Sequence, residues 1–242
     1  MFGLEIATVG LLHLVSISDS GVAMAKAEAI KKIKCQPTHD LDIKIAPTIS
    51  STQYDFSKAT SELSVLGSGA YSPYGSEHKT SMLGLTDGRH ELSLENSYSM
   101  ETYPGLDRGC IHIKSITVKM NFSPTIYVAR EFPKGTCEFK DVFSHEKEHV
   151  KITREMLNKH AKILGKNLKA ALRRGYSYGP FHANKLPRAQ KKLGEKVMKM
   201  AVDANKKMYA EMEKRQNKFD RQEKNRESLN QCANAKNSAV GR

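Results

Sequence analysis

The segment His145-Glu146-Lys147-Glu148-His149 holds the side chains best suited to chemistry in this chain, because it matches the pattern H-E-x-x-H. Histidines four positions apart lie on one face of a helix, so their ring nitrogens can converge on one tetrahedral metal ion. Glu146 lies between them and can act as general base on a zinc-bound water, whose pKa falls toward about 7. We therefore predict a zinc site on His145 and His149, with Glu146 as the catalytic residue.

A catalytic zinc site needs a third protein ligand, and the residues just after the motif do not supply one. Glu155 follows on the same helix but points about 80° away from His145, at 100° per residue. Two long helices joined near residue 180 would instead form an antiparallel hairpin. At equal rise, this hairpin places residues of about 211–217 opposite the motif.

The acidic residues near that level are Glu211, Glu213, Asp220 and Glu223. Glu211 lies closest to the apolar stripe of the second helix, so the helical wheel favours it. Glu223 lies at the margin of the stripe, and Asp220 lies outside it unless the helix has ended. His160 and His182 are further candidates, which leaves the third ligand open on geometry alone.

Strands are predicted ahead of the motif. Apolar side chains alternate with polar ones over residues 116–122, which is typical of a strand with one buried face. Ser123-Pro124 is predicted to turn the chain into a second strand over residues 125–129. Ile111 and Ile113 are at odd positions, whereas the apolar residues over 116–122 are at even ones. A bulge near Lys114-Ser115 would place both sets on the same face of the strand.

Helices are predicted from the motif onward. Apolar residues recur every three or four positions from residue 138, and no proline interrupts them before Pro180. A Gly-rich connector over residues 175–180 precedes a second helix, predicted from about Pro187 to Leu229. The fold class is therefore α+β, with a small, mostly antiparallel sheet followed by two long antiparallel helices.

The N-terminus has most of the pattern of an export signal. An apolar stretch over residues 6–15 precedes A-x-A patterns at residues 23–27, although the stretch before it holds Glu5 and no Lys or Arg. We predict a signal peptide over 1–25, a β-rich part over 26–137, a helical part over 138–230 and a tail over 231–242, with 26–230 as one domain. The expected location is periplasmic or extracellular.

The four cysteines, Cys35, Cys110, Cys137 and Cys232, agree with export. None belongs to a C-x-x-C pair, which argues against a thiolate zinc site. An even number in an exported chain predicts two disulfides, for which three connectivities exist. We favour Cys110–Cys137 with Cys35–Cys232.

Positive charge is concentrated in the C-terminal part of the chain. Residues 151–242 hold 24 Lys and Arg against 8 Asp and Glu, whereas residues 1–150 hold 15 against 18. Such a surface attracts anionic phospholipid headgroups or acidic wall polymers. This supports an alternative function, a non-catalytic basic protein of the cell envelope. Nucleic-acid binding rests on charge alone and is not expected, and the oligomeric state is left open.

A stretch from Arg108 to Ile152 resembles a family of uncharacterised bacterial secreted proteins that are predicted to be zinc-dependent proteases. The shared features are a Gly-Cys ahead of paired strands, then H-E-x-x-H at the start of a long helix. This sequence departs from the pattern at Val150, where the family has Gly. The aromatic-Asp pair Phe219-Asp220 is similar to a segment of that family. The resemblance implies a zincin-like fold, zinc as cofactor and Asp220 as third ligand.

The leading hypothesis is therefore a secreted or periplasmic zinc metallopeptidase that hydrolyses peptide bonds. The substrate would be an extended peptide, expected along the strand at residues 125–129. Tyr176 and Tyr178 could polarise a substrate carbonyl, although such tyrosines more often pack a turn. The remaining histidines, His78, His90 and His112, have no partner at ligand spacing and are expected to be structural.

Overall fold

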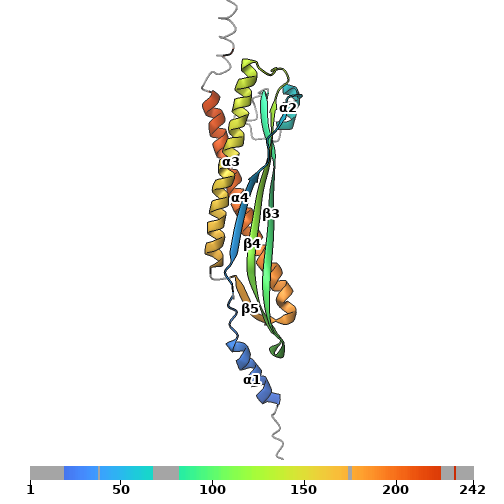
Figure 1. The fold of residues 1–242 in the computed structure, drawn as a ribbon, viewed down its shortest axis with the longest axis vertical. Coiled ribbons are helices and arrows are strands. Elements are labelled where there is room, and N and C mark those ends of the chain that lie inside the picture. The colour runs from blue at the N-terminus through green and yellow to red at the C-terminus, as the bar shows by residue number, and fades with distance from the viewer. Residues whose placement is uncertain (1–18, 38, 68–81, 174–175, 225–231, 233–242) are drawn as a thin grey trace, which may run out of the picture.

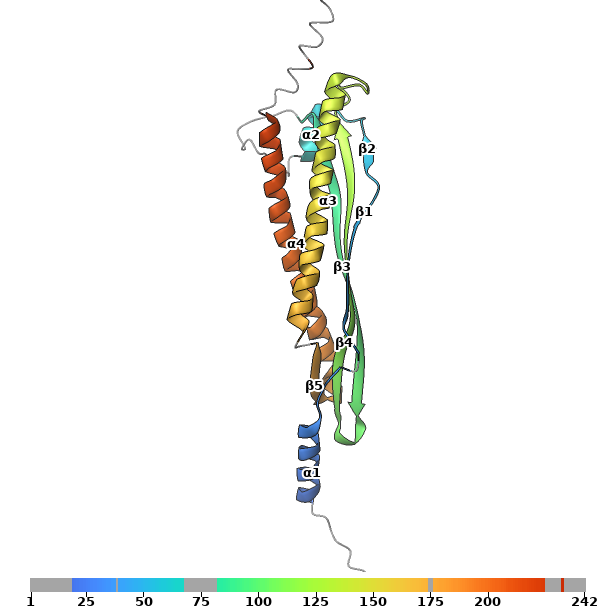
Figure 2. The ribbon, with the colours of Figure 1, turned by 60° about the vertical axis from the view of Figure 1, so that its left-hand side comes forward.

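The structure is a computed structural model that describes residues 19–37, 39–67, 82–173, 176–224 and 232. Helices α3 (Cys137–Leu172) and α4 (Leu186–Lys224) lie side by side along a long sheet (Figures 1 and 2). Helix α1 (Asp19–Lys32) projects from one end, and the short α2 (Thr60–Leu66) lies near the other. The predicted α+β class is confirmed.

Strand β4 (Arg108–Val128) is the axis of the sheet. Strand β3 (Gly84–Tyr103) runs antiparallel along the whole of one edge. On the other edge β1 (Asp42–Ile49) and β2 (Gln53–Asp55) are parallel to β4, and β5 (Ser177–His182) is antiparallel to it. The sheet is therefore mixed, and the expected antiparallel pairing holds only for β3 and β5.

The predicted turn at Ser123-Pro124 is wrong, because β4 runs through both residues without a break. The ladder with β1 ends at Phe122, and the ladder with β2 begins at Thr125. Pro124 falls in the gap between the two short strands. A proline has no N–H to donate, so the sequence places it where that edge of β4 has no partner strand.

The predicted bulge in this strand is confirmed. Ser97 pairs with Ser115 but Tyr98 pairs with Ile113, so Lys114 is an extra residue on β4. The extra residue reverses the alternation of side chains along the strand. As a result Ile113 and Ile116, on either side of the bulge, both point into the core and are fully buried.

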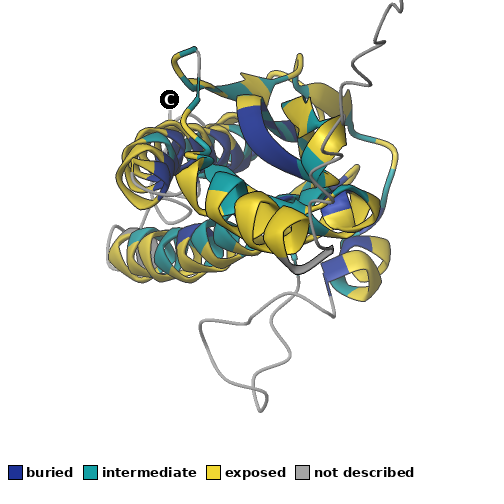
Figure 3. Cartoon of the chain, turned by 90° about the horizontal axis from the view of Figure 1, so that it is seen from below, coloured by how far each residue is buried: buried dark blue, intermediate teal, exposed yellow. Residues whose placement is uncertain are grey.

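One face of the sheet packs against both long helices, and the other face is polar. Figure 3 shows buried residues gathered where sheet and helices meet, with exposed residues on the outer helical surfaces. The alternating apolar residues of β4 and the stripes of α3 and α4 form one cluster, which includes Ile116, Val118, Met120, Met156, Leu157, Leu164, Leu168, Leu193, Val197 and Met208. Burial of these stripes fixes how each helix is rotated about its axis.

Strand β5 sets the register between the two helices. It carries the chain past the end of α3, and the 3-10 turn η3 (Ala183–Lys185) then leads into α4, which runs back (Figures 1 and 2). The six residues of β5 carry the chain roughly 20 Å. Because a helix rises less per residue, α4 needs about 13 residues to return over the same distance. The residues level with the motif therefore lie later in α4 than the equal-rise estimate, since Asp220 lies against His149 where a hairpin about residue 180 would place residue 211.

The predicted disulfide pairing is wrong. Cys35 is bonded to Cys110, and Cys137 is bonded to Cys232. Cys110 lies near the start of β4 and Cys137 beyond its far end, so they are separated by about 60 Å of strand. A disulfide requires Cα atoms within about 7 Å, so the pair Cys110–Cys137 is excluded by the length of β4.

Among the helices that the structure describes, none is long and apolar enough to cross a membrane. Most of the predicted signal peptide, residues 1–18, lies outside the described residues. Its proposed cleavage patterns at residues 23–27 lie within α1.

Gly179 in β5 fits its place only without a side chain. Its φ is 132°, and a Cβ would lie 2.8 Å from the Gly109 carbonyl oxygen and 2.7 Å from Cys35 Sγ. We expect Gly179→Ala to lower the free energy of unfolding by about 2 kcal/mol or more, since both backbone conformation and contact are unfavourable. Urea unfolding measures the change. Gly105→Ala, where a Cβ meets nothing within 4 Å, is the matched control, and equal stability of the two variants would contradict the prediction.

Candidate metal centre

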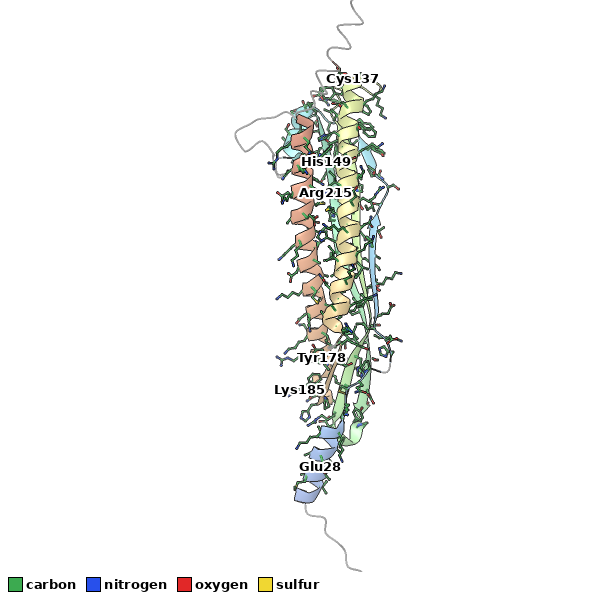
Figure 4. The ribbon with its side chains drawn as sticks, turned by 90° about the vertical axis from the view of Figure 1, so that its left-hand side faces the viewer. Glu28, Cys137, His149, Tyr178, Lys185 and Arg215 are labelled. Carbon is green, nitrogen blue, oxygen red and sulfur yellow. A yellow bond between two sulfur atoms is a disulfide. The ribbon has the colours of Figure 1, made fainter. Side chains whose placement is uncertain are left out.

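Capping and packing hold the first turns of α3 in place. The helix begins after Thr136, whose hydroxyl accepts a hydrogen bond of 3.2 Å from the Phe139 backbone N–H. Phe139, Val142 and Val150 are buried in one cluster with the end of β4. Val150 is thus a core residue. These contacts turn His145 and His149 toward α4, and Figure 4 shows His149 at the contact between the two helices.

The structure brings His145, His149 and Asp220 together. His149 Nε2 lies 2.9 Å from Asp220 Oδ1 and 3.0 Å from His145 Nε2. His145 Nε2 lies 3.4 Å from the same carboxylate oxygen. The three donor atoms therefore form a nearly equilateral triangle between α3 and α4.

The triangle has the dimensions of a zinc site. Zinc binds histidine nitrogen and carboxylate oxygen at about 2.0–2.2 Å, so tetrahedral geometry separates any two donors by about 3.3 Å. Two imidazoles and one carboxylate are a known donor set for catalytic zinc. The residues present therefore fit this ion, with a fourth position left for a small ligand.

The charge of Asp220 suits a cation. Burial acts to raise its pKa, but the two adjacent histidines outweigh burial and lower the pKa to about 2. Its Oδ1 atom is enclosed and has no well-aligned hydrogen-bond donor among the described residues. A metal ion would supply the partner that this buried, ionised oxygen lacks.

The ring of Phe219 packs against both histidines. Its ring is stacked on His145, with centroids 4.9 Å apart and planes at 29°, and meets His149 edge-on at 5.4 Å. Such contacts restrict the rotamers of both imidazoles. The adjacent residues Phe219 and Asp220 thus serve different purposes, since one orients the histidines and the other completes the donor set.

Glu146 lies at the contact of α3 with β3, close enough to His149, His145 and Asp220 for their charges to act on it. Its Oε2 atom accepts a hydrogen bond of 2.7 Å from the Thr86 hydroxyl, and the residue is 5% exposed. Burial raises its pKa, and the positive charge of His149 and the Thr86 hydrogen bond oppose that rise. A Cβ on Gly84 would lie 2.7 Å from Glu146 Oε1, so glycine leaves the space that this carboxyl occupies.

The histidines and Asp220 remain accessible. The exposed fractions of their side chains are 27% for His145, 12% for His149 and 18% for Asp220. The three side chains are therefore partly open to solvent, although Asp220 Oδ1 itself is enclosed between them.

The other candidate ligands lie elsewhere or have other partners. Glu211, favoured by the helical wheel, is paired with His160 at 2.9 Å and with Lys159. His182 lies at the far end of the molecule, 3.1 Å from Asp107. The side chain of Glu223 lies outside the part of the chain that is described. The helical wheel favoured Glu211, and the equal-rise estimate placed it level with the motif because that estimate did not include β5.

The tyrosines and the other histidines considered in the sequence analysis have contacts outside the triangle. Tyr176 and Tyr178 lie in or beside β5, where the Tyr176 hydroxyl donates to the His39 carbonyl. His112 is buried beside Ser177, and His90 stacks on Phe122. His78 lies outside the described residues.

The structure also changes the expected place of an extended substrate. Residues 125–127 belong to β4 and pair with β2 on one side and β3 on the other, so this part of the strand has no free edge. The prediction for this strand is therefore wrong. Among the described strands, none pairs with the outer edge of β3, which carries Gly84 and Thr86 next to Glu146. No motif in the sequence identifies these two residues.

Comparison with family models, with curated proteins and with solved structures found no match to this chain. The functional argument therefore rests on the geometry of the chain's own residues.

The triangle predicts that Asp220 and not Glu211 is the third ligand. We expect Asp220→Asn to weaken zinc binding more than about 100-fold, beyond the 10–100-fold effect typical of outer-shell residues. Calorimetric titration of the metal-free protein with zinc measures the change. Glu211→Gln is the matched control on the same helix and should leave the affinity within about threefold, because Glu211 contacts only Lys159 and His160. A larger loss in the control than in Asp220→Asn would exclude the assignment.

Proposed function

We propose that the chain is a zinc-dependent peptidase with a zincin-like site, in which His145, His149 and Asp220 bind the metal and Glu146 is the general base. The observation that carries the proposal is the triangle of donor atoms beside a buried carboxyl group. Two neutral imidazoles and one carboxylate leave a zinc ion with net positive charge. Bound zinc would supply Lewis-acid chemistry, polarising a carbonyl and making water more acidic.

Glu146 has the properties of a proton acceptor for that chemistry. Burial raises the pKa of Glu146, which makes its carboxylate a stronger base toward the water whose proton it would remove. Thr86 orients one oxygen, which leaves Oε1 to accept the proton of water and pass it to the leaving amine. The hydrogen bond fixes the carboxyl group without neutralising it.

The edge of β3 that pairs with none of the described strands suits a peptide as substrate. An extended peptide can add to a free strand edge through main-chain hydrogen bonds. The residues at this edge, Gly84 and Thr86, adjoin Glu146. A peptide paired there would lie next to the general base. This arrangement supports hydrolysis of an amide bond in an extended chain.

Export is part of the proposal. The chain has two disulfides, Cys35–Cys110 and Cys137–Cys232. Disulfides persist in oxidising compartments such as the periplasm or the extracellular space. Together with the apolar N-terminal stretch of the sequence, they support a secreted or periplasmic location.

The test separates metal binding from catalysis. Glu146→Gln should retain about one zinc per chain and lose 10²–10⁴-fold of its hydrolysis rate, because general base catalysis contributes roughly that factor. His149→Ala should lose both the metal and the activity. Metal content is measured by elemental analysis and hydrolysis with a pool of quenched fluorescent peptides.

The matched control is Glu148→Gln, which alters an exposed carboxylate of the same motif that pairs with Lys151. This substitution should change neither the zinc content nor the rate of hydrolysis. Full activity in Glu146→Gln, or no zinc in the native protein, would refute the proposed function.

A further inference from the structure

A cleft lies far from the metal centre, between β5 and the first turns of α4. It encloses about 500 Å³, and Tyr178, Phe181 and Leu193 give it an apolar lining. Figure 4 shows Tyr178 and Lys185 at this end of the molecule, next to α1. Clefts of this size hold small organic ligands, so the space exceeds the needs of an inorganic ion.

Four cations surround this cleft, Lys185, Arg188, Lys192 and Lys196. Lys185 ends η3, and a spacing of four positions places the other three along one side of α4, where neighbouring like charges repel. None of them forms an ion pair with a carboxylate of the described residues. Lys196 donates only to the Tyr178 hydroxyl, at 3.4 Å. An anion in the cleft would relieve the repulsion.

The direction of α4 increases the preference for an anion. Helix N-termini carry partial positive charge and usually hold acidic residues in the first turn. The first turn of α4 holds none, Arg188 lies there instead, and Lys185 directly precedes the helix. The positive end of the helix therefore adds to the field of the side chains.

We propose that this cleft binds an acidic phospholipid. The phosphate would lie among Lys185, Arg188 and Lys192, with the acyl chains beginning on Tyr178 and Phe181. A free phosphate or a nucleic acid would satisfy the cations but leave the apolar lining unused. The site is distinct from the metal centre and does not depend on the proposed peptidase activity.

The first test uses the full chain and vesicles of phosphatidylcholine with or without phosphatidylglycerol. The triple variant Arg188→Gln, Lys192→Gln, Lys196→Gln should bind the acidic vesicles on the order of 100-fold more weakly, since each basic residue near an anionic surface contributes about fivefold. The control removes three exposed lysines from the middle of α4, Lys206→Gln, Lys207→Gln and Lys214→Gln. An equal loss in both variants would show general charge attraction and overturn the cleft.

The second test asks whether the lipid enters the cleft. Ala189 lines it, so Ala189→Phe fills the space and keeps all four cations. This variant should lose binding of soluble short-chain phosphatidylglycerol by at least tenfold in calorimetry, while an unchanged melting temperature shows that it folds. Retained binding in Ala189→Phe, or equally tight binding of inorganic phosphate, would refute a lipid site. Self-association that this variant abolishes would place a second copy in the cleft and also overturn the proposal.

Discussion

The register between α3 and α4 is the constraint on which the candidate metal centre depends. His145 and His149 belong to α3 and Asp220 belongs to α4. The triangle therefore forms only when the two helices have one particular register along their axes. Strand β5 sets that position by its length. If β5 were one residue longer or shorter, α4 would shift by about 3.3 Å, or about two helical residues. The position level with His149 would then face roughly 200° away from that of Asp220. The pairs His160–Glu211 and Arg215–Glu155 hold the same register along the contact.

The site combines groups of different electrostatic character from three elements. On the α4 side the side chains of an ionised carboxylate and two imidazoles lie partly open to solvent. On the β3 side Glu146 is buried and hydrogen-bonded to Thr86, so its charged form is less stable than in water. The disulfide Cys137–Cys232 joins the first residue of α3 to the segment that follows α4. This bond limits separation of the helices beside the donor triangle.

Local patterns predicted the two long helices and the bulge at Lys114, because each depends on neighbours within one or two turns or strand pairs, whereas α1 and α2 were not predicted. The third member of the triangle depended on the path of β5, which has no strong periodicity and contains Gly179 and Pro180. Thr86 and Gly84 were not predicted, since they reach Glu146 only through the pairing of β3 with β4. The disulfides were mispaired because sequence spacing does not reveal that β4 is one uninterrupted strand.

The two proposed sites lie at opposite ends of one continuous helix, which makes their separation a fixed dimension of the fold. From Arg188 to Asp220, α4 rises about 48 Å at about 1.5 Å per residue. The core packs against this helix along its length, through Leu193, Val197 and Met208, so it is held against bending. With α4 upright on a lipid surface at the cationic cleft, the donor triangle would stand nearly 50 Å above the headgroups. Substrates within reach would then be polypeptides that extend well beyond the membrane surface.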